Sequence, residues 1–361
     1  MKKLTDKYKK RLLCANKREM AKRQKHGARY DKEQSRTILL PSIMTLQKEE
    51  GHTALCKAIN NIKRWVKSCE IHRVILDFSK VDTITPEGML LLFAELDVIN
   101  RLRGKTVFTI KQPSNRRCAQ VLRKIGFYEL LGKKQPQYPE ISDETVVHWV
   151  VLQNTNTKPV GWEILMKQTG DIGLYTPVTE AIDNSISHGY SGSRDDFFCC
   201  KKAFAEGQKW WMFSQRKDEE LHIALADLGI GFSKSLKEQD LSKNKSVKHK
   251  LIEIFGKKPW TDDEVLKVVV DAALEGEHTV TSTGAAHRGK GIAQICHLAQ
   301  TTSRSRLWIW SNRGGYCIKR GQSMLHSRTP KRGVKVKFPF SINGTILYWS
   351  IPTGVKHERK H

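Results

Sequence analysis

Three polar residues in the second half of the chain have the chemistry of a site for a cation or a reactive water. Glu180, Asn184 and His188 follow one another at four-residue intervals, so on a helix of 3.6 residues per turn they share one face. The amide oxygen of Asn184 is suited to bind Mg²⁺, and the carboxylate of Glu180 is suited to polarise a water or hydroxyl. Alone, such a triplet is also typical of an ordinary surface helix.

The surrounding residues predict the helix that must carry this triplet. Small and apolar residues recur at helical spacing on the other side: Val178, Ala181, Ile182, Ser185 and Ile186. Pro177 stands near the expected start, where its missing N–H costs little, and Gly189 stands where the helix should stop. For His188, helix capping or packing is an alternative to a chemical role.

An aspartate and two glycines follow a predicted strand. Residues 221–226 are largely apolar and alternate, and the run Asp227-Leu228-Gly229-Ile230-Gly231 comes directly after them. A carboxylate at the base of an apolar pocket accepts a hydrogen bond from an exocyclic amine such as that of adenine. Glycines there let a ligand approach the backbone closely. An ordinary turn between strand and loop is the alternative.

A glycine-rich loop precedes a predicted apolar helix. It contains Arg288, Gly289, Lys290 and Gly291, and the helix begins at Ile292. Free N–H groups at a helix start bind phosphate, and the two basic residues add positive charge. The loop is not a Walker A sequence, because G-x4-G-K-S/T is missing.

The order of the segments is more informative than any one of them. After the loop, Gly344-Thr345 stands at the start of a last alternating strand over residues 346–351. A Glu-x3-Asn-x3-His helix, D-x-G-x-G, G-x-G before a helix and Gly-Thr before the last strand together resemble the GHKL ATPases (gyrase, chaperone and histidine-kinase type). The loop and the helix most resemble the anti-sigma factor serine kinases. The resemblance implies an α/β two-layer sandwich that binds ATP and Mg²⁺.

The resemblance also implies roles at the catalytic and base-binding positions. Glu180 would be the general base or water-polarising carboxylate, and Asn184 would hold Mg²⁺. Asp227 would bind the adenine amine, with Gly229 and Gly231 admitting the base.

At the other end of the nucleotide, the resemblance implies a phosphate cradle. Gly289, Lys290 and Gly291 would surround the phosphates, with Arg288 adding charge. Thr345 would support adenine through a water.

The middle of the chain alternates between strand-like and helix-like runs. Strands are predicted over residues 37–46, 74–78 and 106–110, and helices over 49–69, 87–103 and 114–124, with Ser114 as the N-cap of the last helix. Such alternation predicts a small α/β sandwich.

This pattern resembles the STAS domain of anti-sigma factor antagonists. Those proteins carry Asp-Ser before the long helix, and a partner kinase phosphorylates the serine. This chain has Thr85-Pro86-Glu87-Gly88 there, so the usual phosphorylation switch is missing unless Thr83 or Thr85 replaces it. Glu87 either supplies a permanent charge at the helix start or is an ordinary first-turn glutamate.

These observations predict an α/β protein of two domains. Residues 1–36 form a basic arm, 37–131 a STAS-like domain, 132–144 a linker, 145–352 the GHKL-like domain and 353–361 a charged tail. Within the second domain, residues of about 233–281 are expected to form an ATP lid, on which the STAS-like domain docks as an internal partner.

The charge is concentrated at the front of a strongly basic chain. The net charge is +26, and residues 1–40 hold 14 Lys or Arg against 4 Asp or Glu. Such an arm attracts nucleic acid or an acidic protein surface, and a solvated extension is the alternative. No apolar run approaches the length of a membrane span. The eight scattered cysteines contain no CxxC pair, which favours a reduced, cytoplasmic protein.

Two functions from different classes follow. One is an ATP-dependent regulator of the partner-switching type, with serine/threonine kinase-like or ATPase activity toward a protein partner. The other is a nucleotide-gated binding module without kinase activity, whose basic arm binds nucleic acid. A relative that has lost nucleotide binding is a third reading, and a homodimer is among the assemblies that we consider.

Overall fold

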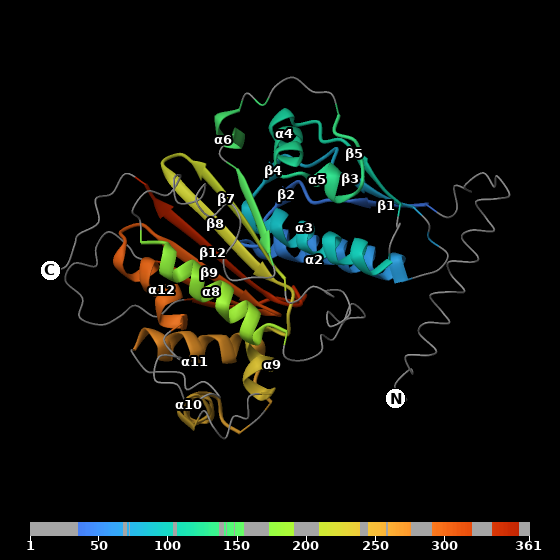
Figure 1. The fold of residues 1–361 in the computed structure, drawn as a ribbon. Helices are drawn as coiled ribbons and strands as arrows, with labels where there is room; N and C mark the ends of the chain where they lie inside the picture. The colour runs from blue at the N-terminus through green and yellow to red at the C-terminus, as the bar shows by residue number, and fades with distance from the viewer. Residues whose placement is uncertain are drawn as a thin grey trace.

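The fold is of the mixed α/β class, which confirms the class expected. The computed structural model describes residues 35–67, 71, 73–103, 107–136, 141, 143–147, 149–154, 173–190, 209–238, 245–257, 259–275, 291–319 and 334–353. These residues form a seven-stranded sheet, a three-stranded sheet and a two-stranded pair (Figure 1). None of their helices is both long enough and apolar enough to cross a membrane.

Residues 35–136 form a small α/β unit, which we call the N-terminal unit. Strands β1 (Ser35–Leu39), β3 (Arg73–Asp77) and β5 (Val107–Lys111) pair in parallel in that order, and β2 (Ile43–Met44) pairs with β4 (Thr83–Ile84). The helices are α2 (Glu49–Lys67), α3 (Pro86–Arg103), α4 (Arg116–Lys124) and α5 (Phe127–Leu130). The predicted strand over 37–46 is divided around Pro41, which has no N–H to continue a ladder.

The N-cap of α4 differs from the prediction by one residue. Asn115, not Ser114, is the cap, and its side chain accepts hydrogen bonds from the backbone N–H groups of Arg117 and Cys118. The Ser114 hydroxyl instead donates to the carbonyl of Ser79 at 3.0 Å. Both residues are good caps by type, so the tertiary contact of Ser114 decides between them.

The seven-stranded sheet is antiparallel throughout and is built from the second half of the chain. Its order is β11-β10-β9-β12-β8-β7-β6. The strands are β6 (Val150–Asn154), β7 (Trp210–Lys217), β8 (Glu220–Asp227), β9 (Arg306–Ser311), β10 (Gly314–Lys319), β11 (Val334–Lys337) and β12 (Thr345–Pro352). The helices are α6 (Glu144–Val147), α8 (Tyr175–His188), α9 (Gly231–Glu238), α10 (Lys245–Phe255), α11 (Asp262–Leu274) and α12 (Gly291–Thr301). Alternate strand residues pack with α8, α11 and α12 in one apolar cluster.

Helix α11 lies within the segment that we expected to form a lid. It starts in a capping box, with the Glu264 carboxylate accepting from the Thr261 N–H at 2.9 Å. Its apolar side is buried, and it packs on β10, β11 and α12. The lid prediction over 233–281 was therefore too wide, because this helix is part of the layer that covers the sheet.

Helix α3 is enclosed between the rest of the N-terminal unit and the seven-stranded sheet. All residues from Pro86 to Ile99 are buried, as expected for a helix that is apolar on nearly every side. It packs against β7, β8 and β12, on the sheet face opposite α8, α11 and α12 (Figure 1). The N-terminal unit thus shares one core with the sheet. Its expected docking on the lid segment stays a prediction; in the described residues its most apolar helix is buried against the sheet face opposite α8, α11 and α12.

Buried ion pairs hold α3 in this position. Lys209, just before β7, donates to Asp97 at 2.5 Å, and the Trp211 indole N–H donates to the same carboxylate oxygen at 2.9 Å. On the other side, Lys63 of α2 donates to Glu95 at 2.6 Å. All four charged side chains are at least nine-tenths buried, so each needs its partner.

The start of α3 lies in the core. Glu87 is fully buried, and one of its carboxylate oxygens accepts from the Thr45 hydroxyl at 2.8 Å and the Gln47 amide at 3.2 Å. Burial raises the pKa of Glu87. A Cβ on Gly88 would lie 2.3 Å from the carbonyl oxygen of Met44. Of the two alternatives stated for Glu87, the internal position of its side chain favours an ordinary first-turn glutamate over a permanent charge at the helix start.

We expect Asp97→Ala to lower the free energy of unfolding by about 3–5 kcal/mol, since it removes the carboxylate to which buried Lys209 and Trp211 donate. Denaturant unfolding measures this loss. Lys111→Ala is the control: it breaks the Asp77 pair, whose lysine side chain is 61% exposed, at a cost of at most about 1 kcal/mol. Asp97→Asn combined with Lys209→Met should recover most of the loss. Equal losses for Asp97→Ala and Lys111→Ala would contradict this account.

Candidate functional site

Helix α8 carries Glu180, Asn184 and His188 as predicted, and it ends at His188 with Gly189 as its C-cap. Val178, Ala181 and Ile182 are buried against the sheet. The three polar residues are half-buried, so their face lies at the edge of the covered surface. The helix therefore presents an amide and a carboxylate one turn apart beside the sheet.

Asp227 ends strand β8 beneath this helix. It is 5% exposed. One carboxylate oxygen accepts from the hydroxyl of Ser185 at 3.3 Å, and the other accepts from the N–H of Gly229 at 3.0 Å. A Cβ on Gly189 would lie 3.3 Å from the second oxygen. The C-terminal half of α8 is thus in direct contact with the carboxylate that the sequence singled out.

The two glycines after Asp227 are required by contacts inside the protein. A Cβ on Gly229 would lie 1.8 Å from the carbonyl oxygen of Gly189, which also accepts from the N–H of Ile230 at 2.7 Å. Gly231 has a φ of 75°, and a Cβ there would meet the Asn312 amide nitrogen at 2.4 Å. We expected these glycines to admit a base. In the structure, the space left by their missing side chains is taken by Gly189 and Asn312.

The start of helix α12 meets the polar face of α8. A Cβ on Gly291 would lie 3.0 Å from a carboxylate oxygen of Glu180 and 3.1 Å from the amide nitrogen of Asn184. The three remaining residues of the predicted phosphate cradle, Arg288, Gly289 and Lys290, lie outside the described residues. A helix N-terminus that faces Glu180 and Asn184 is suited to hold an anion beside a cation.

Thr345 lies next to Asp227 in the sheet. The two residues are direct partners across strands β12 and β8. Thr345 is two residues from Leu347 on β12, and Asp227 is two residues from Leu225 on β8, so each pair lies on the same face of the sheet. Leu347 and Leu225 pack in the cluster that contains α8, so Thr345 and Asp227 also face α8. The preceding Gly344 is so close that a Cβ there would lie 2.2 Å from the backbone oxygen of Asp227.

The electrostatics favour Glu180 as a proton acceptor. Partial burial raises the pKa of its carboxyl, and the nearby charge of Asp183 raises it further. A carboxylate with a raised pKa holds a proton more readily near neutral pH than an ordinary glutamate does.

Sequence reasoning missed three residues that shape the site. Ser185 donates to Asp227. Asn312, in the β9–β10 turn, donates from its side chain to the carbonyl of Ile230 at 2.9 Å. The hydroxyl of Ser311 accepts from the N–H of Phe232 at 2.8 Å. The sequence analysis placed Ser185 in the apolar stripe, and its position next to Asn184 was the only sequence signal for a role in the site. Ser311 and Asn312 carry almost no sequence signal, because a Ser-Asn pair is common where a strand ends in a turn.

Comparison with protein-family models, with curated proteins and with solved structures returns no match. The assignment of a function therefore rests on the geometry of the described residues.

We expect opposite effects from one substitution at two glycines of the site. Gly229→Ala should lower the free energy of unfolding by about 1–3 kcal/mol, because its Cβ would overlap a backbone oxygen. Gly291→Ala should leave stability unchanged or raise it by up to about 1 kcal/mol, since it begins a helix and would touch only side-chain ends. Thermal unfolding of both variants tests this. A Gly229→Ala variant no less stable than Gly291→Ala would contradict the importance of the close contact between Gly229 and Gly189.

Proposed function

We propose that this chain binds Mg-ATP in a site of the GHKL type. The support comes from one observation: four segments far apart in the sequence, one of them α8, come together. Asp227 contacts Ser185, Thr345 is the strand partner of Asp227, and Gly291 lies against Glu180 and Asn184. These are the positions that the sequence motifs assign to base, metal and phosphate, and they line up in that order along one helix.

The site offers a distinct role to each position. At one end, the buried carboxylate of Asp227 accepts the exocyclic amine of adenine, and Thr345 and Ser185 hold a bridging water beside it. At the other end, the amide oxygen of Asn184 binds Mg²⁺ together with phosphate oxygens and waters, which is how proteins usually hold this ion. The start of α12 at Gly291 faces the phosphates.

Glu180 is the residue suited to activate the attacking group. It lies one turn from Asn184 and beside Gly291, so it reaches the end of the nucleotide where phosphoryl transfer takes place. Its raised pKa matches a carboxylate that takes a proton from a water or a hydroxyl.

The biological role that we propose is that of an ATP-dependent regulator of the partner-switching type. The N-terminal unit has the strand and helix order on which the STAS resemblance rests. The start of α3, where antagonists carry the phosphorylated serine, is buried and has Glu87 instead. The protein that receives a phosphate, or that is sequestered, is therefore a separate partner rather than the N-terminal unit.

The buried start of α3 also favours the second candidate, a nucleotide-gated module without kinase activity. If no phosphate acceptor exists in the chain, ATP binding alone would set the shape of the segment before α12. A chain that binds ATP but shows neither turnover nor a phosphorylated protein fits this second candidate.

Calorimetric titration with Mg-ATP tests the site. We expect the wild type to bind Mg-ATP and Asp227→Asn to lose binding. The substitution replaces one acceptor oxygen of the carboxylate with an NH₂ donor, which cannot accept a hydrogen bond from the adenine amine. Asp218→Asn is the control: it is the same substitution in the β7–β8 turn, where the side chain is 78% exposed, and it should bind as the wild type does. Equal affinity in all three proteins would refute the base contact.

ATP turnover tests the role of Glu180. Glu180→Gln should reduce the rate by about 10²–10⁴-fold, as expected for loss of a general base. In the wild type the rate should fall on the acid side at a pH above the ordinary pKa of a glutamate, since the carboxyl must be ionised to accept a proton and its pKa is raised. Phosphate release measured against pH gives both results. A Glu180→Gln rate within twofold of wild type would rule out this role.

A further inference from the structure

The loop between β11 and β12, residues 338–344, is in contact with the N-terminal unit. Phe338 stacks on His52 of α2, with ring centroids 3.9 Å apart and planes 16° apart. Lys57 of α2 lies over the ring of Phe340, with its Nζ 5.4 Å from the centroid. Ile342 is 2% exposed and belongs to the cluster formed by α2 and α3. The loop is therefore seated on the N-terminal unit by its apolar side chains.

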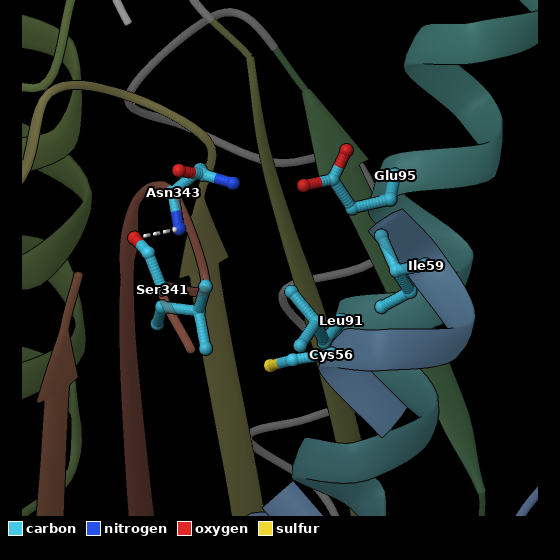
Figure 2. A pocket seen from close by; sticks show the side chains of 7 residues that line it. Cys56, Ile59, Leu91, Glu95, Ser341 and Asn343 are labelled. Carbon is cyan, nitrogen blue, oxygen red and sulfur yellow. Dashed lines mark hydrogen bonds between the residues drawn. The ribbon is translucent and has the colours of Figure 1, made fainter. Parts of the chain in front are cut away.

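Figure 2 shows the contact between this loop and helices α2 and α3. Ser341 and Asn343 lie on one side of a narrow crevice, and Cys56, Leu91 and Glu95 lie on the other. The loop is braced internally by the N–H of Asn343, which donates to the Ser341 hydroxyl at 3.0 Å.

The same loop ends in the proposed base-binding region. Its last residue, Gly344, presses on the backbone of Asp227. The carbonyl of Gly344 accepts from the N–H of Asn312 at 3.0 Å, and the carbonyl of Asn312 accepts from the N–H of Ile342 at 3.1 Å. The side chain of Asn312 then donates to the carbonyl of Ile230. One chain of hydrogen bonds thus runs from the seated loop to the segment that follows Asp227.

A second route leaves the N-terminal unit through α3. Asp97 binds the ammonium group of Lys209, and the backbone carbonyl of Lys209 accepts from the hydroxyl of Tyr190. That hydroxyl in turn accepts from the N–H of Leu228 at 3.2 Å. Tyr190 is 8% exposed. This route reaches Leu228, the residue directly after Asp227, without passing through the loop over 338–344.

We propose that the N-terminal unit controls nucleotide affinity in cis, by holding the base-binding end of the site through these two routes. When α2 and α3 pack in place, they hold Gly344 and residues 228–230, which surround Asp227, in fixed positions. A change that loosens this packing lets both segments move and weakens the binding of Mg-ATP. This inference rests on the proposed function and adds the regulation of the same site. The phosphate end, where α12 meets α8, is outside both routes.

The first test loosens the loop without touching the site. Ile342→Ala in the full chain should weaken Mg-ATP binding about fivefold or more, within the usual range of coupling between two sites. Leu122→Ala is the matched control, because it removes a fully buried aliphatic side chain of the same size from α4 of the same unit. It should change stability and leave the affinity within twofold of wild type. Calorimetry gives the affinities, and thermal unfolding gives the stabilities.

The second test cuts the other route with a smaller change, in case Ile342→Ala does not fold. Tyr190→Phe removes only the hydroxyl between Lys209 and Leu228, and should weaken Mg-ATP and adenosine by a similar factor of about threefold or more, since the lost contact is at the base end. Tyr128→Phe is the control: it removes a hydroxyl that donates to Gln112 inside the N-terminal unit.

The outcomes separate this inference from the proposed function. A wild-type chain that does not bind Mg-ATP overturns the proposed function and the inference with it. A wild-type chain that binds, while Ile342→Ala and Tyr190→Phe bind as tightly as their controls, overturns the coupling alone. Weaker binding in both test variants but not in the controls supports it. By reciprocity, Mg-ATP should also slow amide hydrogen exchange in α2 and α3 of the wild type and do so less in the two test variants.

Discussion

Helix α3 sets the constraint on which the rest of the structure depends. It is apolar on nearly every side, so it is stable only where both of its sides are covered. Helices α2 and α5 of the N-terminal unit pack on it within one apolar cluster, and the seven-stranded sheet covers it through β7, β8 and β12. The carboxylates that it carries into this interior need partners, and those partners come from both halves: Lys63 for Glu95, and Lys209 with Trp211 for Asp97. Burial of one helix therefore fixes the position of two units at once.

The position of the sheet then determines the geometry of the site. With α3 against β7, β8 and β12, the opposite faces of these strands are free to receive α8 and α12. Asp227 and Thr345 are neighbours because β8 and β12 pair in register over eight residues, from Thr345–Asp227 to Pro352–Glu220. Gly189, Gly229 and Gly344 let three backbone segments close around the carboxylate with no side chain between them. The site is a consequence of backbone packing as much as of its polar groups.

The sequence predicted the parts of this arrangement that have local causes. The four-residue spacing of Glu180, Asn184 and His188 and the position of Gly189 correctly defined α8. The capping sequence at Thr261 is a local cause of the start of α11, whereas the burial of this helix depends on contacts with β10 and β11. The partner of Ser114 across a loop decided the N-cap of α4. The helix α3 was predicted from the sequence, but its burial was not, because the seven-stranded sheet that covers it and the lysines that pair with Glu95 and Asp97 come from distant parts of the chain.

The start of α3 suggests how such a protein is controlled. The sequence resemblance drawn for the N-terminal unit places a phosphorylated serine at this position. Here the equivalent helix start lies in the core, and Glu87 is held by Thr45 and Gln47 with its pKa raised by burial. At the start of the helix, the hydroxyl of Thr85 donates to the carbonyl of Met44 at 2.7 Å, and a second charge beside the buried Glu87 would have no water to stabilise it. The regulation that we propose therefore acts through the packing of the N-terminal unit on the sheet, which the loop over 338–344 and Tyr190 connect to the surroundings of Asp227.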